Sequence, residues 1–341
     1  MPVPTRYVHV GFPKAASSSL QNFYFAVHPE CYHLGLGFQS RGNRYVNEEI
    51  EILSEVDLRL KKHFLWDGAR GRARIEAAAA AAEEGGYRAV GLSNEFLSFA
   101  LGNEVDTADK ANRLHEVFGP GTKAVIVVRE QFGFLRSLYL EMLKGGYGGS
   151  FRNFLEYTLL YQVRSWATDI CYDNMWRHYS RVFGDGNVCM VAFEQLKEDT
   201  PGFLGQIAGA LGISDSVTEL KAVNTQREEL NWYEQLRRYN ERFPHEFGAR
   251  FYEPFNMNRM RAYFHSELKL AVPHDRLADD MLRIPFSQAA NAVVEMSKVR
   301  DINLEVPEAL GDELRRMFAP SNRRLMDATG LPLDRYGYVL D

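Results

Sequence analysis

Residues 11–20 place a lysine and three consecutive serines directly after a short apolar run at residues 7–10. The stretch reads Gly-Phe-Pro-Lys-Ala-Ala-Ser-Ser-Ser-Leu and continues into residues with helical spacing. Backbone N–H groups at a helix start carry the positive end of the helix dipole, and the serine hydroxyls and Lys14 add further donors. The pattern predicts a loop that binds a phosphate-like anion. The alternative is an ordinary surface turn whose serines cap a helix.

Arg129 and Ser137 form a second candidate pair for an anion. Arg129 ends the apolar run 123–128, and Ser137 follows on a predicted helix. Parallel strands bind ligands at their carboxyl ends, so Arg129 is expected to face the same crevice as the loop. A guanidinium and a hydroxyl suit a second phosphate. The alternative is that Arg129 pairs with Glu130 and Ser137 is an exposed helix serine.

Together the two motifs resemble the donor site of the sulfotransferase superfamily. The loop is similar to its 5′-phosphosulfate loop, usually Pro-Lys-x-Gly-Thr-Thr/Ser-x-Leu, and Arg129 with Ser137 is similar to its 3′-phosphate motif. Residues 187–213 look like the family's next strand and helix, and residues 317–338 like the end of bacterial carbohydrate-type members. The resemblance covers residues 5–225 and 305–340.

The resemblance implies a site for 3′-phosphoadenosine-5′-phosphosulfate, with adenosine 3′,5′-bisphosphate as product and no metal. Lys14 would be catalytic, stabilising charge on the leaving group, and a loop with Arg227 would close over the 3′-phosphate. The donor-binding residues implied are Pro13, Lys14, Ala15, Ala16, Ser17, Ser18, Ser19, Arg129, Ser137 and Arg227.

The loop departs from the family pattern at Ala16, where a glycine is usual. Alanine reaches positive φ less readily than glycine, so the loop must take a conformation that alanine tolerates. We expect this substitution to reduce donor affinity.

Glu95 is the candidate general base, because it follows the apolar run 88–92 at the same expected edge of the sheet. Family members use a glutamate near this point or a histidine to take the proton of the acceptor hydroxyl. The alternative is that the Glu95 carboxylate only interacts favourably with the dipole at the start of a following helix. The fallback bases are His9, His33, His63 and His115.

Short apolar runs alternate with longer helical stretches, which predicts an α/β fold with a parallel sheet and crossover helices. A P-loop-like strand-loop-helix and a helical insertion belong to this prediction. The expected strands are residues 7–10, 88–92, 123–128 and 187–193. The expected helices are residues 72–84, 108–118, 130–144, 200–211 and 307–329.

The chain is expected to divide into three parts. Residues 1–227 form the donor-binding core, and residues 301–341 add a helix and tail that complete it. Residues 228–300, rich in aromatic residues and arginine, form a helical insertion that either covers the acceptor or packs as a satellite core. The acceptor is expected to be a carbohydrate or a small-metabolite hydroxyl.

Composition narrows the remaining choices. A formal net charge of −5 gives no overall attraction to nucleic acid or to an anionic membrane. Three separated cysteines and no long apolar stretch favour a cytoplasmic protein without a membrane span. The oligomeric state is left open. Two other functions also stay open: a nucleotide-dependent kinase with a degenerate phosphate loop, and a non-catalytic nucleotide-binding protein on the same fold.

Overall fold

A five-stranded sheet forms the centre of the protein, in the order β2-β3-β1-β4-β5, and each pairing is parallel. The computed structural model describes residues 3–37, 44–100, 104–144, 146–163, 166–221, 229–242 and 300–341. The strands are β1 (Thr5–His9), β2 (Cys31–His33), β3 (Ala89–Ser93), β4 (Lys123–Val128) and β5 (Val188–Ala192). β1 lies between β3 and β4, so its carboxyl end opens at the middle of the sheet edge.

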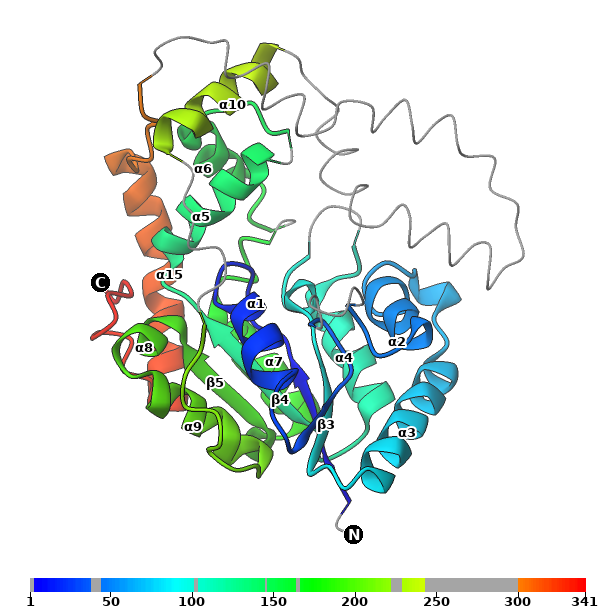
Figure 1. Ribbon diagram of the computed structural model, residues 1–341. Coiled ribbons are helices and arrows are strands. Elements are labelled where there is room, and N and C mark those ends of the chain that lie inside the picture. The colour runs from blue at the N-terminus through cyan, green and yellow to red at the C-terminus, as the bar shows by residue number, and fades with distance from the viewer. Residues whose placement is uncertain are drawn as a thin grey trace, which may run out of the picture.

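Helices connect the strands in the crossover pattern of a wound sheet (Figure 1). The first group is α1 (Ser17–Leu20), the π-helix η1 (Gln21–Phe25), α2 (Glu48–Ile52), η3 (Leu53–Asp57), η4 (His63–Leu65), α3 (Gly68–Glu84), η5 (Glu95–Leu97) and α4 (Thr107–Phe118). The second is α5 (Gln131–Lys144), α6 (Phe151–Leu160), α7 (Tyr172–Phe183), η6 (Asp185–Asn187), α8 (Phe193–Glu198), α9 (Thr200–Leu211), α10 (Leu230–Arg242) and α15 (Glu308–Thr329).

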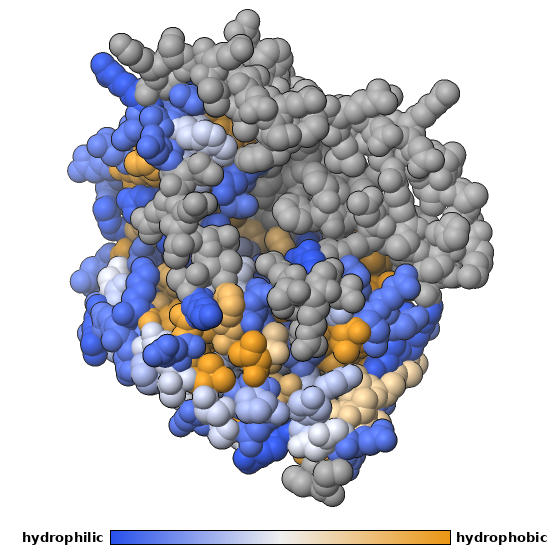
Figure 2. Space-filling view, in the orientation of Figure 1, coloured by the Kyte–Doolittle hydropathy of each residue, from blue (hydrophilic) through white to orange (hydrophobic). Residues whose placement is uncertain are grey.

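Helices cover both faces of the sheet. α4 contacts α3 and α7, and α7 packs on β4 and β5, whereas α9 contacts β1, β4 and β5. In Figure 1, α1 and α9 lie in front of the strands, and α5, α6 and α10 lie above the strand ends. Figure 2 shows the same side with hydrophilic residues along the outer edges and apolar residues gathered toward the middle.

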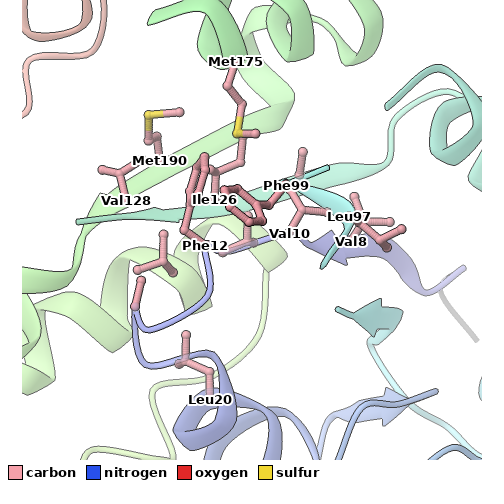
Figure 3. Close-up of a cluster of buried hydrophobic side chains, with 14 of the residues drawn as sticks. Val8, Val10, Phe12, Leu20, Leu97, Phe99, Ile126, Val128, Met175 and Met190 are labelled. Carbon is pink, nitrogen blue, oxygen red and sulfur yellow. The ribbon is translucent and has the colours of Figure 1, made fainter. Parts of the chain in front are cut away.

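The core is continuous beneath the loop that follows β1. β4 is apolar after its first residue and buried on both faces, as a central parallel strand requires. Phe12 from the loop and both Leu97 and Phe99 from the segment after β3 belong to the same buried cluster as Ile126 (Figure 3). The two loops that end β1 and β3 are therefore anchored in one core.

The carboxyl helix α15 is joined to the core by buried polar pairs. The amides of Gln131 and Asn322 exchange hydrogen bonds, with 2.6 Å from Gln131 Nε2 to Asn322 Oδ1. Asp173 accepts from the Ser321 hydroxyl at 2.6 Å and from Arg324 at 2.6 Å. These bonds fix α15 against the beginnings of α5 and α7.

α10 is the described part of the predicted insertion, and it docks on the end of α5. Asn240 is buried, and its amide donates to the carbonyls of Leu143 at 2.8 Å and Tyr147 at 3.1 Å. The N–H of Ile302 donates to the carbonyl of Leu230, so the chain returns beside the start of α10. Residues 243–299 of the predicted insertion lie outside the described residues.

The α/β prediction with a parallel sheet is confirmed. The four expected strands correspond to β1, β3, β4 and β5, and the five expected helices to α3, α4, α5, α9 and α15. β2 was not predicted, because three residues are too short to show a pattern. Among the helices that the structure describes, none combines the length and apolar character needed to cross a membrane.

Candidate active site

The loop after β1 is built on its own buried residues. The Phe12 N–H donates to the carbonyl of Val127 on β4 at 3.0 Å, and the Phe12 ring packs edge-on against Tyr172 at 4.9 Å. The Phe12 carbonyl accepts from the Ala15 N–H and from the Ser17 hydroxyl, at 3.2 and 3.1 Å. The Ser17 hydroxyl is thus used inside the loop, while Ser18 is half-buried and Ser19 buried. Pro13 is half-buried beside exposed Lys14.

Two loop residues have left-handed backbone conformations. Lys14 has φ 64° and Ala16 has φ 63°, a region that costs a residue with a Cβ about 1–2 kcal/mol. A left-handed residue followed by the right-handed start of α1 turns successive N–H groups toward one point, which makes an anion-binding concavity. Within the described part of the chain, the N–H groups of Lys14, Ala16, Ser17 and Ser18 have no acceptor. The strain therefore leaves a row of donors available to a ligand.

Ala16 occupies a position with the backbone geometry that glycine favours. From the sequence we expected the loop to adopt a conformation that alanine tolerates. In the structure Ala16 has φ 63° and ψ 12°, a conformation that alanine adopts only at an energetic cost. The cost is an intrinsic property of the folded loop, and the N–H groups keep their orientation. Backbone strain of this kind is concentrated at functional sites.

Arg129 connects the loop to β4. Its guanidinium donates from Nη1 to the carbonyl of Lys14 at 2.6 Å and lies 5.2 Å from the ring centroid of Phe193. The Tyr172 hydroxyl donates to the Arg129 carbonyl at 2.7 Å and holds the backbone in place. Arg129 therefore lies beside the loop after β1, as the sequence predicted.

No described carboxylate forms an ion pair with Arg129. Glu130 instead accepts from the N–H groups of Phe132 at 2.7 Å and Gly133 at 2.6 Å, so it caps the start of α5. Burial lowers the pKa of Arg129, while the negative charge of Glu194 acts in the opposite direction. The predicted alternative of an Arg129–Glu130 pair is therefore wrong for the described residues, and the guanidinium keeps donors for an anion.

Ser137 lies on α5, on the helix face that reaches the loop. Glu141 is one turn further along the same face, and its carboxylate lies 3.2 Å from Lys14 Nζ. Lys144 is 3.6 Å from the same carboxylate. Lys14 is therefore held on the α5 side of the loop, near the face that carries Ser137. Sequence reasoning missed Glu141, although its spacing of four residues from Ser137 was a usable signal.

Glu95 begins η5, directly after β3, and it is tied to the helix that follows the loop. The buried amide of Gln21 donates from Nε2 to Glu95 Oε2 at 2.6 Å. The Ser98 hydroxyl lies 3.2 Å from the Gly11 carbonyl and 2.9 Å from the Glu95 carbonyl, so it joins the two segments. Gln21 was not predicted from the sequence, because a glutamine after a serine run gives no functional signal.

Two of the fallback histidines, His9 and His33, are buried and hydrogen-bonded. Burial is the main cause that lowers the pKa of His9 to about 3 and that of His33 to about 4, so both stay neutral near pH 7. His9 Nδ1 lies 2.6 Å from the Ser93 hydroxyl, and His33 Nε2 donates to the Leu36 carbonyl at 2.7 Å. His63 is exposed in η4, and His115 stands in the last turn of α4, before β4 begins.

His9 also explains one glycine of the loop. A Cβ at Gly11 would lie 2.6 Å from His9 Nε2, which is closer than a Cβ approaches another heavy atom. His9 is fully buried, and its Nε2 has no partner among the described residues. Only glycine lets the chain pass directly over this ring into the loop.

Arg227 lies outside the described residues, so its expected closure over the donor remains a prediction. A search of the described residues for three or more histidine, cysteine, aspartate or glutamate side chains able to hold one metal ion finds no group.

The fold of this chain is similar to that of a known protein. A solved structure titled as a sulfotransferase from Alicyclobacillus acidocaldarius superposes with a TM-score of 0.51, over 98% of this chain and 99% of that one, at 18% sequence identity. The chain has the sulfotransferase fold. A scan against protein-family models and a search of curated proteins find no match.

In the sulfotransferase fold of this chain, the candidate site lies where β1, β3 and β4 end. The loop after β1, Glu95 after β3 and Arg129 after β4 meet at one edge of the sheet, as the parallel pairing requires. A likeness at 18% identity extends to the fold, so function has to be argued from these residues.

Proposed function

We propose that the protein is a sulfotransferase that moves a sulfuryl group from 3′-phosphoadenosine-5′-phosphosulfate to a hydroxyl of a carbohydrate or small metabolite. The observation that carries this proposal is that, among the described residues, loop N–H groups without acceptors lie beside an arginine without an ion pair. Arg129 donates to the carbonyl of Lys14, so the two anion-binding groups lie side by side at the same edge of the sheet. A donor with phosphates at both ends of its ribose matches two anion sites.

The residues of the loop fit the 5′ end of such a donor. The N–H groups of Ala16, Ser17 and Ser18 would hold its phosphosulfate, and Lys14 would leave Glu141 to neutralise the negative charge of the leaving bisphosphate. Arg129 and Ser137 would hold the 3′-phosphate. When bound, the donor supplies an activated sulfuryl group and a stable phosphate leaving group.

Glu95 would act as the general base. Its carboxylate would take the proton of the acceptor hydroxyl while the acceptor oxygen forms the new bond to sulfur and the bond to the phosphate oxygen breaks. The Gln21 amide fixes one oxygen of the carboxylate at 2.6 Å, which leaves the other for the proton. A cytoplasmic place of action and a bacterial carbohydrate-type specificity belong to the same proposal.

Calorimetric titration with adenosine 3′,5′-bisphosphate tests the donor site, beside adenosine 5′-phosphate and ATP with Mg²⁺. The bisphosphate should bind most tightly. A preference for Mg²⁺–ATP would support a kinase instead, and the sulfotransferase proposal would be withdrawn. Radiolabelled donor should then be turned over with a panel of sugars and small alcohols. Binding of the bisphosphate without transfer to any of them or to water would support the non-catalytic reading.

A further inference from the structure

Lys110 on α4 is fully buried, and its ammonium group ends on the segment that carries Glu95. Its three N–H donors reach the carbonyl of Phe96 at 2.8 Å, the carbonyl of Phe99 at 2.9 Å and Glu104 Oε2 at 2.5 Å. An ammonium has three donors, so all are used. Two of them fix the backbone on the carboxyl side of Glu95.

Other buried polar groups hold the amino side of the same segment. The Asn94 side chain accepts from the Phe96 N–H at 3.0 Å and donates to the Ser54 hydroxyl at 2.9 Å. The Asn94 N–H donates to the His9 carbonyl at 3.0 Å. The guanidinium of Arg59 lies 4.4 Å from the centroid of the Phe96 ring. Every neighbour of Glu95 along the chain is therefore anchored.

The anchors belong to one buried ionic cluster. Arg59 pairs with both Glu55 and Glu104, and Glu104 also pairs with Lys110. The side chains of Arg59, Glu55, Glu104 and Lys110 are at most 4% exposed. A buried ionic cluster contributes little net stability, because proteins with apolar residues of similar size in its place are often equally stable. Within the cluster, Lys110 donates to the carbonyl of Phe96 in the three-residue helix η5 and to the carbonyl of Phe99 just after it.

Building on the function proposed above, we infer that Lys110 is a positioning residue that sets the place of the Glu95 carboxylate through the carbonyls of Phe96 and Phe99. Apolar anchors at Leu97 and Phe99 fix the depth of the segment in the core (Figure 3). Lys110 fixes the path of the backbone between them. The backbone that carries Glu95 is then already fixed in one conformation before the acceptor binds.

Amide hydrogen exchange tests the inference without any substrate. In Lys110→Met, the N–H groups of Phe96, Leu97 and Ser98 should exchange about tenfold faster or more, while β1 and β4 keep their protection. The control is Arg74→Met, which removes a cation whose side chain is 8% exposed and which is paired with Asp57 and Glu49. Unchanged exchange at residues 96–98 in Lys110→Met would overturn the inference. If Lys110→Met does not fold, Lys110→Gln is measured, which keeps two N–H donors without the charge.

A double-mutant cycle connects Lys110 to the chemistry. With radiolabelled sulfate released from 3′-phosphoadenosine-5′-phosphosulfate as the readout, Lys110→Met should slow turnover about 10- to 100-fold and leave bisphosphate affinity unchanged. In the Glu95→Gln background the same change should have almost no further effect, and Lys110→Gln should retain more turnover than Lys110→Met. Independent losses from the two changes would contradict a role through Glu95.

Failure of the proposed function gives a different result. If Glu95→Gln alone leaves turnover at the wild-type rate, Glu95 is not the base, and the inference about its positioning falls with it. If no bisphosphate binds, the proposed donor site fails, whereas the exchange experiment still decides whether Lys110 fixes the segment.

Discussion

The two sides of the candidate site are built in opposite ways. On the donor side, Lys14 and Ala16 have strained backbones, loop N–H groups have no described acceptor, and the Lys14–Glu141 pair is partly exposed. On the base side, the segment after β3 is satisfied by buried partners, with Lys110 and Asn94 using their polar groups on its backbone.

The difference has a physical reason. A site for a highly charged donor needs unused hydrogen-bond donors, which cost folding stability and are repaid on binding. A base needs a fixed carboxylate, because proton transfer depends on reach within about 3 Å. We therefore expect donor-side changes to alter affinity or stability, and base-side changes to alter turnover.

Glu95→Gln is the change with the largest expected effect. It should lower turnover about 10²- to 10⁴-fold, because the amide cannot take the acceptor proton, and leave bisphosphate affinity within about twofold. Steady-state turnover and calorimetry measure the two quantities. Glu76→Gln removes a carboxylate that pairs with Arg6 at the start of β1, and should change neither. An affinity loss as large as the loss of turnover in Glu95→Gln would remove the contrast between the two sides.

Arg129→Ala should mainly weaken donor binding, in contrast to Glu95→Gln, which should mainly lower turnover. Removing charge-assisted hydrogen bonds of about 1.5–3 kcal/mol should weaken adenosine 3′,5′-bisphosphate roughly 10- to 100-fold, and adenosine 5′-phosphate much less. Arg136→Ala, which removes an exposed arginine of α5, serves as the control. Equal losses for both nucleotides would mean that Arg129 supports the loop through the Lys14 carbonyl rather than binding the 3′-phosphate.

The positions of the loop, Arg129 and Glu95 were predicted from the sequence, whereas the buried groups that support Glu95 were not. Lys14 lies in the loop after β1 and Arg129 directly after β4, both strands are recognisable as apolar runs, and parallel strands bring their ends together. The support of Glu95 comes from Lys110, whose acceptors are backbone carbonyls 14 and 11 residues away. Every residue has a backbone carbonyl, so the sequence does not indicate which carbonyls a buried lysine will contact.

The same reason explains the remaining misses. The strain at Ala16 could be anticipated only as a conflict with the family's glycine, since φ depends on how Phe12 and Val127 fix the loop. The tie from Gln21 to Glu95 spans 74 residues and depends on the relative placement of β1 and β3. Both are consequences of tertiary structure.

Ala16→Gly should show whether the backbone strain of the loop affects stability alone or also affects donor binding. Glycine adopts the left-handed conformation without the Cβ penalty, so we expect a gain of about 1 kcal/mol in unfolding free energy after its larger entropy cost is subtracted. Urea denaturation measures the gain. Ala15→Gly, at a buried neighbour without positive φ, should destabilise. Because Ala16 already has the left-handed conformation, bisphosphate affinity should stay within about twofold in Ala16→Gly, contrary to the expectation from the sequence that alanine lowers donor affinity. A larger rise in affinity would support that expectation and mean that the donor bears the strain.

Glu141→Gln should give the smallest effect, and it tests whether Lys14 has to leave a partner before it binds the donor. The side chains of Lys14 and Glu141 are 33% and 41% exposed, and exposed ion pairs contribute about 0.2–1 kcal/mol. Releasing Lys14 should therefore tighten bisphosphate binding about two- to fivefold at low salt, with the gain shrinking as salt screens the pair. Glu156→Gln breaks an exposed pair on α6 and should leave affinity unchanged. Weaker binding in Glu141→Gln would mean that Glu141 orients Lys14 toward the donor instead of competing for it, and the donor side would then share the preorganised character of the base side.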